Sequence, residues 1–297
     1  MPAKRIDTAT SRTAEWTCLA RACSSQERDR HLRCDDYIAI RLVPGFVAML
    51  LRTAPFRAFY RRFLAPRGVY EYVAARTKYI DAAFGDALTT GCEQVVLFGA
   101  GFDTRALRFQ SELRASRVFE LDVPITQAAK LGRYHQRQLI IPYNLTSVAI
   151  DFDRESITAK LREAGFRADQ ASLFILEGVL MYLRRETVDA TFATLGELAC
   201  AGSRVAFDYI RSSVLRGDTS PYGAAAIARS VEEVNEKWHS GMEPDEVAPF
   251  LSRHGFRPLD HSDAAQLEQR YFTSTDGRAV ARVNGTHCLV TAEKLPG

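Results

Sequence analysis

The residues that could do chemistry in this sequence begin with a Gly-Ala-Gly turn. Gly99 and Gly101 follow an apolar run, and Thr104 behind them is a good N-cap for a helix. Glycines let the backbone N–H groups of such a turn approach a ligand closely, because no side chain stands in the way. Asp122 lies near the end of the next apolar run, 21 residues after Gly101, where a carboxylate can accept hydrogen bonds from both hydroxyls of a ribose. This spacing predicts a nucleoside-binding site.

The turn differs from that of dinucleotide-binding enzymes. The third glycine of G-x-G-x-x-G is missing, because Gly101 is followed by Phe102, Asp103, Thr104 and Arg105. The carboxylate of Asp103 would face the phosphates of a dinucleotide with a like charge, which makes a pyrophosphate an unfavourable ligand. The sequence therefore predicts a nucleoside without phosphates.

Strands that alternate with helices must position these residues. Near-continuous apolar runs, which are typical of strands in a sheet covered on both faces, are Gln94–Gly101, Arg117–Pro124, Ser147–Phe152, Ser172–Val179 and Ser203–Ile210. The helices predicted between them are Thr104–Ala115, Ile125–Gln138, Arg154–Ala164 and Arg184–Ala199. This alternation predicts an α/β fold with a parallel sheet and right-handed crossovers.

Two segments depart from the alternation. Residues 1–90 are predicted to form a helical cap, in which Gly68–Thr89 carries apolar residues at three- and four-residue spacing. Arg76 lies on that apolar stripe, and a guanidinium on a buried face needs an anionic or carbonyl partner. Residues 91–297 are predicted to form the core, interrupted after the fifth strand by a lid insertion at about 211–243. The core then resumes with helix Pro244–His254, a short segment near Pro258–His261 and a final strand Thr286–Ala292.

Composition excludes several classes of protein. With 297 residues, 46% hydrophobic and 25% charged, the chain has the composition of a soluble globular protein. The longest apolar run, Leu42–Leu51, is broken by Pro44 and Gly45 and is too short to cross a bilayer, and the N-terminus lacks an apolar signal core. We therefore expect a cytoplasmic protein without a membrane partner. The six cysteines and six histidines show no metal-binding spacing, so no metal site is predicted.

The small net charge of +3 is unevenly placed. Residues 1–78 hold 15 Lys and Arg against 7 Asp and Glu, whereas residues 79–297 hold 24 against 29. A solvated helical surface would explain this basic front third, and so would a lid that attracts an anionic substrate. No nucleic-acid partner is predicted, because apolar residues dilute the basic ones.

A family resemblance adds to this interpretation. Five strings together resemble the leucine carboxyl methyltransferase family, including its bacterial branch of S-adenosylmethionine-dependent O-methyltransferases: RTKYID (76–81), VVLFGAGFDTRALRF (95–109), FELDVP (119–124), AIDF (149–152) and LEGVLMYL (176–183). The resemblance covers about residues 70–210. It implies a Rossmann-like methyltransferase sheet, mostly parallel and of seven strands. The implied cofactor, S-adenosylmethionine, is a nucleoside without phosphates.

The resemblance also implies roles for single residues. Arg76 would pair with the carboxylate of the methionine moiety, and Gly99 and Gly101 would lie against that moiety. Asp122 would hold the ribose hydroxyls. Glu177, which follows the fourth strand, would lie near the amino group of the cofactor, although a plain loop carboxylate is the alternative.

The adenine and the acceptor would be held elsewhere. Asp151 and the backbone of Phe152 would read the adenine, since a carboxylate can accept from the exocyclic amine while an N–H donates to a ring nitrogen. A helix cap is the alternative role for Asp151. Tyr182 and Trp238 are candidate walls of the acceptor pocket, with an ordinary core role as the alternative for Trp238.

The acceptor is the part that the sequence addresses least directly. The family favours a methyl ester on a small-molecule carboxylic acid, an anionic acceptor that is ionised at neutral pH and needs no general base. No catalytic residue is predicted for that case. A phenol or alcohol would need a base, for which the sequence offers Asp208, His239 and His254. A protein C-terminal carboxylate is a further possible acceptor. A nicotinamide-dependent oxidoreductase and a nucleoside-binding protein without turnover are the competing functions.

Overall fold

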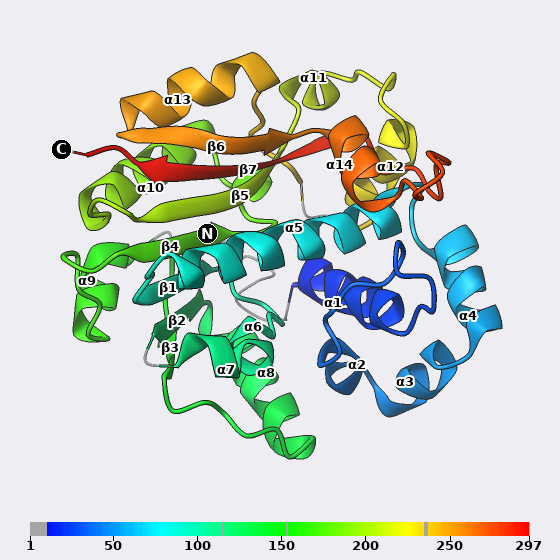
Figure 1. Ribbon diagram of the computed structural model, residues 1–297, viewed down its shortest axis with the longest axis horizontal. Helices are drawn as coiled ribbons and strands as arrows, with labels where there is room; N and C mark the ends of the chain where they lie inside the picture. The colour runs from blue at the N-terminus through cyan, green and yellow to red at the C-terminus, as the bar shows by residue number, and fades with distance from the viewer. Residues whose placement is uncertain (1–10, 115, 153, 235–236, 297) are drawn as a thin grey trace.

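The computed structural model describes residues 11–114, 116–152, 154–234 and 237–296. Its seven strands form a single sheet in the order β3-β2-β1-β4-β5-β7-β6 (Figure 1). The strands are β1 (Gln94–Phe98), β2 (Arg117–Asp122), β3 (Leu145–Ala149), β4 (Ser172–Leu176), β5 (Arg204–Ile210), β6 (Phe256–Ser262) and β7 (His287–Lys294). β1 to β5 pair in parallel, whereas β7 runs antiparallel to both β5 and β6. The predicted seven-stranded, mostly parallel sheet is confirmed.

The order of the strands places the ligand-binding edge. From β1 the chain proceeds outward to β2 and β3, and then returns to place β4 on the other side of β1. In open α/β sheets, ligands bind outside the carboxyl ends of the strands at such a switch point. Gly99 directly follows β1 and Glu177 directly follows β4, so both lie at this edge.

Helices cover both faces of the sheet, as the apolar strands require. On one face α9 (Ile157–Glu163), α10 (Arg185–Leu198) and α13 (Val247–Arg253) share a core with alternate residues of the strands. On the other face lie α5 (Val69–Thr89), α6 (Arg105–Arg108), α7 (Gln110–Leu113) and α14 (Ala264–Tyr271). α8 (Pro124–Gln136) contributes Tyr134 to a third cluster, which it shares with the N-terminal helices.

Two elements differ from the predicted ones. The single helix expected over Thr104–Ala115 is broken at Phe109, where the ring packs 4.8 Å from the ring of Phe84 on α5 and the backbone leaves the helical region. α14 was not predicted. Its signal is a capping box in which the side chain of Asp263 accepts from the N–H of Gln266 and the side chain of Gln266 accepts from the N–H of Asp263.

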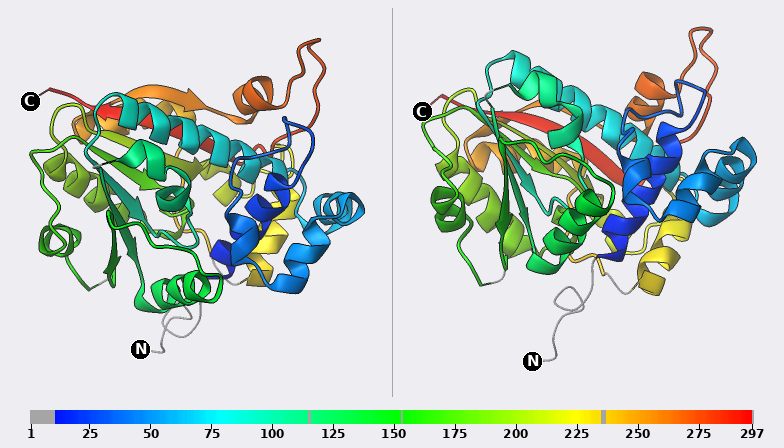
Figure 2. Two further views of the ribbon diagram at one scale, coloured as in Figure 1. Left: turned by 60° about the horizontal axis from the view of Figure 1, so that its bottom comes forward. Right: turned by 90° about the horizontal axis from the view of Figure 1, so that it is seen from below.

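The N-terminal helices cover the carboxyl edge of the sheet. They are α1 (Arg12–Ser25), α2 (Ala39–Leu42), α3 (Gly45–Leu51), α4 (Ala54–Phe59) and the π-helix η2 (Tyr60–Leu64). By its packing, α5 belongs with the sheet, although the predicted cap runs to residue 90. The segment predicted as a lid insertion holds α11 (Ser212–Leu215) and α12 (Ala224–Val234). In both views of Figure 2, the yellow α12 lies beside the blue N-terminal helices. Within the described ranges, no helix is both long and apolar enough to span a bilayer.

Candidate active site

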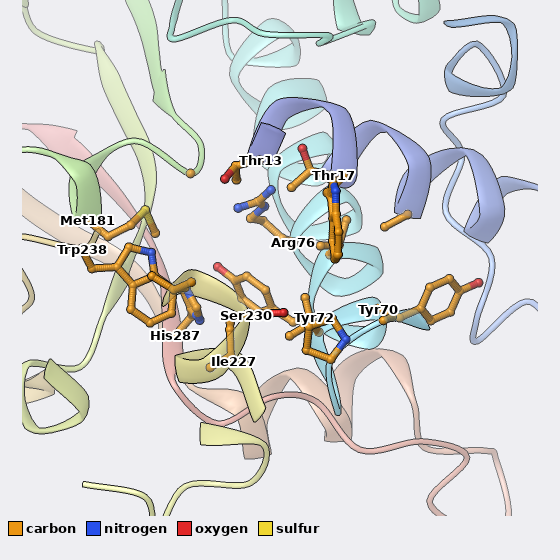
Figure 3. A pocket seen from close by; sticks show the side chains of 18 of the residues that line it. Thr13, Thr17, Tyr70, Tyr72, Arg76, Met181, Ile227, Ser230, Trp238 and His287 are labelled. Carbon is orange, nitrogen blue, oxygen red and sulfur yellow. The ribbon is translucent and has the colours of Figure 1, made fainter. Parts of the chain in front are cut away.

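Two adjoining cavities lie at the carboxyl edge of the sheet. The glycine-turn cavity, named after Gly99 and Gly101 in its wall, encloses about 1810 Å³ of empty space, including the part open to solvent. The aromatic cavity is named after Trp16, Tyr60, Tyr70, Tyr72 and Trp238, and encloses about 880 Å³ on the same measure (Figure 3). The residues that line both cavities are Thr13, Thr17, Arg76, Gly178 and Tyr182. A ligand in one cavity can therefore meet a ligand in the other at this shared wall.

The glycine turn is held open by its backbone conformation. Gly99 has φ +57° and Gly101 has φ +49°, a region that side chains of L-residues rarely adopt. A Cβ atom on Gly101 would lie 3.3 Å from the Cβ of Ala14 on α1. The turn therefore needs glycine both for its conformation and for the close approach of α1.

Asp122 closes the turn from the neighbouring strand. Its Oδ2 accepts a hydrogen bond of 2.6 Å from the N–H of Gly101, and its Oδ1 accepts one of 2.7 Å from the N–H of Val123. Burial raises the pKa of the Asp122 carboxyl above its usual value, although these two N–H groups oppose the rise. The carboxylate lines the glycine-turn cavity in a fixed orientation, at the place predicted for a ribose.

A network of buried charges adjoins this cavity, and Arg21, Arg76, Asp103 and Glu177 of the network line its wall. Four guanidiniums and five carboxylates are joined by ion pairs: Arg21, Arg76, Arg105 and Arg108 with Asp36, Asp81, Asp103, Glu177 and Asp208. Burying an ionised group is costly unless partners compensate its charge, and here each member has at least one partner. With all nine groups ionised, the network carries a charge of −1.

Arg76 and Glu177 lie at the centre of the network. Arg76 Nε lies 3.0 Å from Glu177 Oε1, and Arg76 Nη1 donates to Asp208 Oδ2 at 2.8 Å. Burial alone would raise the pKa of the Glu177 carboxyl, but Arg105 and Arg76 lower it to about 2, so Glu177 is ionised at neutral pH. These carboxylates are the anionic partners that the position of Arg76 on an apolar stripe requires.

The expected effect of Asp103 needs correction. Its carboxylate pairs with the guanidinium of Arg105, which also donates to Glu177 Oε2 at 2.8 Å. Burial alone would raise the pKa of the Asp103 carboxyl, but Arg105 lowers it below its usual value. Because Arg105 compensates this charge inside the protein, Asp103 does not present a bare anion to a ligand. The other argument against a dinucleotide, the missing third glycine of the turn, still holds.

Asp208 is wrong as a candidate general base. Its side chain is completely buried, and it accepts hydrogen bonds from the Tyr72 hydroxyl at 2.7 Å, from Arg76, and from the N–H of Gly178 at 2.5 Å. It lines neither cavity. Asp208 holds Arg76 and the loop after β4 in place, and no acceptor can reach it.

The two histidine candidates for the general base lie in different places, and one of them lines a cavity. His254 ends α13 and faces Asp189 of α10 at 3.1 Å, so it lines neither cavity and is wrong as a base. His239 lines the glycine-turn cavity with an exposed side chain. Among the described residues, no group of three or more His, Cys, Asp or Glu side chains could hold a metal ion.

Asp151 and Phe152 lie beside the glycine-turn cavity and not in its wall. The N–H of Ile150 donates to the carbonyl of Asp122 at 3.0 Å, which brings this segment next to the end of β2. The N–H of Asp151 is used by Glu155 Oε2 at 2.8 Å. Their role with the adenine stays a prediction. The other five predicted cofactor residues, Arg76, Gly99, Gly101, Asp122 and Glu177, all line the cavity.

The aromatic cavity is built from segments far apart in the sequence. α1 and η2 supply Trp16 and Tyr60, α5 supplies Tyr72, and α12 supplies Ile227. Tyr182 and Trp238, the predicted acceptor-pocket residues, both lie in its wall. Of the described residues in the wall, Arg76 is the one Lys or Arg, and it is committed to two carboxylates.

Sequence reasoning missed His287, which also lies in this wall. It begins β7, stacks on Tyr72 with ring centroids 4.6 Å apart, and meets Trp238 edge-on at 5.5 Å. Burial lowers the pKa of the imidazole to about 4, so the ring is neutral at pH 7. A single histidine at the start of a strand carries no motif. The rings that contact it, Tyr72 and Trp238, are more than forty residues away in sequence, so only the folded structure brings them together with His287.

A comparison with known protein families identifies the family of this chain. The model of the leucine carboxyl methyltransferase family matches residues 14–196. The chain belongs to this family. The family resemblance found in the sequence is thereby confirmed, and the match extends through α1, well before residue 70.

Relatives in this family come from actinobacteria. A protein of Streptomyces coelicolor is 32% identical over 190 residues, which are 64% of this chain and 64% of that protein. One of Mycobacteroides abscessus is 31% identical over 207 residues, 66% of this chain and 65% of that protein. The matched stretch thus spans less than two thirds of either relative. Both carry the name of an S-adenosyl-L-methionine-dependent methyltransferase, which agrees with the cofactor expected from the sequence.

Solved structures confirm the fold over nearly the whole chain. A structure from Thermobifida fusca, described as that of a methyltransferase, has a TM-score of 0.61 and 15% identity, and covers 99% of this chain and 98% of its own. A protein of the DUF574 family from Streptomyces avermitilis has a TM-score of 0.59 and 16% identity, with 93% and 96% covered. The α/β methyltransferase fold therefore extends beyond residue 210, where sequence resemblance ended.

Proposed function

We propose that this chain is an S-adenosylmethionine-dependent O-methyltransferase whose acceptor is a small, mainly apolar molecule. The observation that carries the proposal is the shared wall of the two cavities at Arg76, Gly178 and Tyr182. It provides one space with a nucleoside-type turn and a second space with aromatic walls, and the two adjoin at these residues.

The charge of the site supports this cofactor. S-adenosylmethionine carries a sulfonium, an ammonium and a carboxylate, so its net charge of +1 opposes the −1 of the buried network. Glu177 would face the ammonium, and the guanidinium of Arg76 would meet the carboxylate. Asp122 would accept from the ribose hydroxyls, while Gly99 and Gly101 allow the backbone to approach.

Methyl transfer depends first on how the two ligands are positioned. S-adenosylmethionine supplies a methyl group on a positively charged sulfur. The protein holds an acceptor oxygen in line with that methyl group and keeps water away. α1, α12 and Trp238 line the aromatic cavity and would help to exclude water from it.

The acceptor group follows from the charges in the aromatic wall. A carboxylate, which the family name favours, would find Arg76 as the one Lys or Arg among the described residues of this wall. That guanidinium already pairs with Glu177 and Asp208, and it would also meet the carboxylate of the cofactor. An uncharged hydroxyl on an aromatic body avoids that desolvation cost. We therefore favour a phenol or enol over a carboxylic acid, with methyl-ester formation as the second candidate because of the family.

Binding and product analysis test the proposal. Calorimetry with S-adenosylmethionine, S-adenosylhomocysteine and NAD should show binding of the first two at micromolar levels. Incubation with S-adenosylmethionine and paired aromatic acids and phenols should give a methylated product by mass spectrometry. Mild alkali releases methanol from a methyl ester and leaves an aryl ether intact. Binding of NAD without binding of S-adenosylmethionine would overturn the proposed function.

A further inference from the structure

The hydrogen bonds around His287 fix where its proton lies. The Nδ1 of His287 lies 2.7 Å from the hydroxyl oxygen of Thr286, and that hydroxyl lies 2.5 Å from Asn284 Oδ1. Asn284 Nδ2 donates to the carbonyl of Arg67 at 3.0 Å, which orients the amide so that its oxygen faces Thr286. The backbone N–H of Thr286 donates to the same oxygen at 3.1 Å.

These hydrogen bonds are compatible with one arrangement of protons. Asn284 Oδ1 can only accept, so the single hydroxyl proton of Thr286 is used in the bond to it. The Thr286 oxygen therefore accepts from His287, and Nδ1 carries the proton of the neutral imidazole. The lone pair of the ring is then on Nε2.

Nε2 is the atom available to a ligand. It makes no hydrogen bond with any described residue, although His287 lies in the wall of the aromatic cavity. Figure 3 shows the ring between Trp238 and Tyr72, whose rings hold its plane. The charged groups near the imidazole are Asp208, which favours protonation, and Arg76, which opposes it. Burial outweighs both, so the ring is a hydrogen-bond acceptor at neutral pH.

We propose that Nε2 of His287 accepts a hydrogen bond from the hydroxyl of the methyl acceptor and takes its proton as the methyl group arrives, which selects a phenol or enol. This inference rests on the proposed function. A carboxylate would direct its lone pairs at the lone pair of Nε2 and would leave both polar groups unsatisfied.

The transfer balances in atoms and electrons. A lone pair of the acceptor oxygen forms the new O–C bond, while the S–C bond breaks and its electron pair stays on sulfur as a thioether. The electrons of the O–H bond stay on the oxygen, which becomes an ether, and the proton moves to Nε2. The imidazolium then releases the proton to water.

A weakly basic imidazole is sufficient for this role. An oxygen that is gaining a methyl group becomes positively charged, and its proton is then far more acidic than an imidazolium. The proton can therefore move late in the reaction to a base too weak to deprotonate a free phenol. His287 thereby orients the hydroxyl first and removes the proton afterwards.

Nitrogen NMR of the full chain tests the tautomer and the contact. The protein is labelled with ¹⁵N-histidine and saturated with S-adenosylhomocysteine, and His287 is assigned by the loss of its signals in His287→Asn. We expect the Nδ1–H tautomer, and a shift of Nε2 when 2-naphthol is added. Neither 2-methoxynaphthalene nor 2-naphthoate, which lack the proton, should cause this shift. An Nε2–H tautomer, no shift with 2-naphthol, or an equal shift with the methoxy compound overturns the inference.

Kinetics distinguish proton acceptance from a structural role. His287→Asn should slow methylation of 2-naphthol by at least about a hundredfold, but methylation of a nitro-naphthol that is already ionised by less than about tenfold. His287→Gln, which places an amide oxygen near the position of Nε2, should recover part of the loss. Affinity for S-adenosylmethionine should stay unchanged in both variants. Equal losses for both naphthols overturn the inference.

The two proposals fail in different ways. If the native protein binds S-adenosylmethionine and methylates 2-naphthoate but not 2-naphthol, the His287 inference is wrong and the methyltransferase function stands. If the native protein does not bind S-adenosylmethionine, the proposed function is wrong. An Nε2–H tautomer would overturn the inference even when no naphthalene is turned over.

Discussion

The charged residues of this site are coupled, because each of the central guanidiniums pairs with more than one carboxylate. Arg76 pairs with both Glu177 and Asp208, and Arg105 connects Glu177 to Asp103 and Asp81. A change at one of these positions alters the potential at its neighbours, because the buried pairs are poorly screened by solvent. Substitutions at this scale should therefore affect cofactor binding even where the residue does not touch the cofactor.

Asp122 gives the most direct test of the cofactor site. Asp122→Ala should lower the affinity for S-adenosylmethionine at least about tenfold, because it would remove the two charge-assisted hydrogen bonds proposed for the ribose. It should also lower the melting temperature, since the N–H groups of Gly101 and Val123 lose their acceptor. Calorimetry and thermal unfolding measure the two effects.

The matched control for this change is Asp122→Asn. Its amide oxygen keeps an acceptor for the N–H of Gly101, so its melting temperature should fall less, while its affinity for the cofactor should still be reduced. Unchanged affinity in a folded Asp122→Ala protein would show that the ribose is held elsewhere.

Asp208 should behave as a positioning residue. Asp208→Asn removes one of the two ion pairs of Arg76 and should lower the free energy of unfolding by about 3 kcal/mol. It should weaken S-adenosylmethionine binding, while the pH dependence of kcat/KM keeps its shape. Loss of the acid limb of that profile, with stability and cofactor affinity as in the native protein, would restore Asp208 as a base.

At the scale of elements, α5 connects the two cavities. Tyr72 and Arg76 are one turn apart and therefore lie on one face of the helix. Tyr72 lies in the aromatic wall, whereas Arg76 lies in the wall shared by both cavities. α5 also packs on the sheet, which gives both side chains a rigid base. α1, α12 and Trp238 complete the aromatic cavity, which is the proposed acceptor space.

Trp238 tests whether the aromatic cavity binds the acceptor and the glycine-turn cavity binds the cofactor. Trp238→Ala should raise KM for the acceptor about tenfold or more, because an aromatic wall of the acceptor space is lost. The dissociation constant of S-adenosylmethionine should stay within about twofold, since Trp238 lines only the aromatic cavity. Steady-state kinetics and calorimetry measure the two quantities.

Ile227→Ala on α12 is the control from the same wall. It should change KM in the same direction but by less, because a smaller side chain is removed. Equal weakening of cofactor and acceptor binding by Trp238→Ala would mean that the indole supports both cavities.

For the whole molecule, acid should lower stability in two ranges of pH. The pKa of His287 falls from 6.5 to about 4 on folding, so the unfolded chain takes up a proton that the folded chain refuses. The free energy of unfolding should therefore fall as the pH drops from about 6.5 to 4, by about 3 kcal/mol from this residue. Glu177, with its pKa lowered to about 2, adds a further loss below pH 4.5.

Urea unfolding of the unliganded protein at pH 7, 5.5 and 4.5 measures this dependence. His287→Asn should have a flatter dependence between pH 6.5 and 4.5, because the titrating group is absent. The comparison between the two proteins removes the contribution of other groups. The same slope in both would show that His287 does not titrate abnormally in the folded state.

The sequence by itself determined the features that depend on neighbours along the chain. Strand runs, the Gly99–Gly101 turn and Asp122 at the end of β2 were predicted from spacing, because a period of apolar residues and a turn are local properties. Topology then follows from the handedness of βαβ units, so the same local signals also place Glu177 at the ligand-binding edge.

Only the tertiary structure decided how residues distant in sequence are paired. Asp208 looked like a candidate base, but folding places it under Arg76, 132 residues earlier, as a buried partner. His287 had no signal at all, and it gained a role because Tyr72 and Trp238 enclose it and Asn284 and Thr286 orient it. Local spacing cannot predict such pairs, since they depend on which helix and strand ends meet at the edge of the sheet.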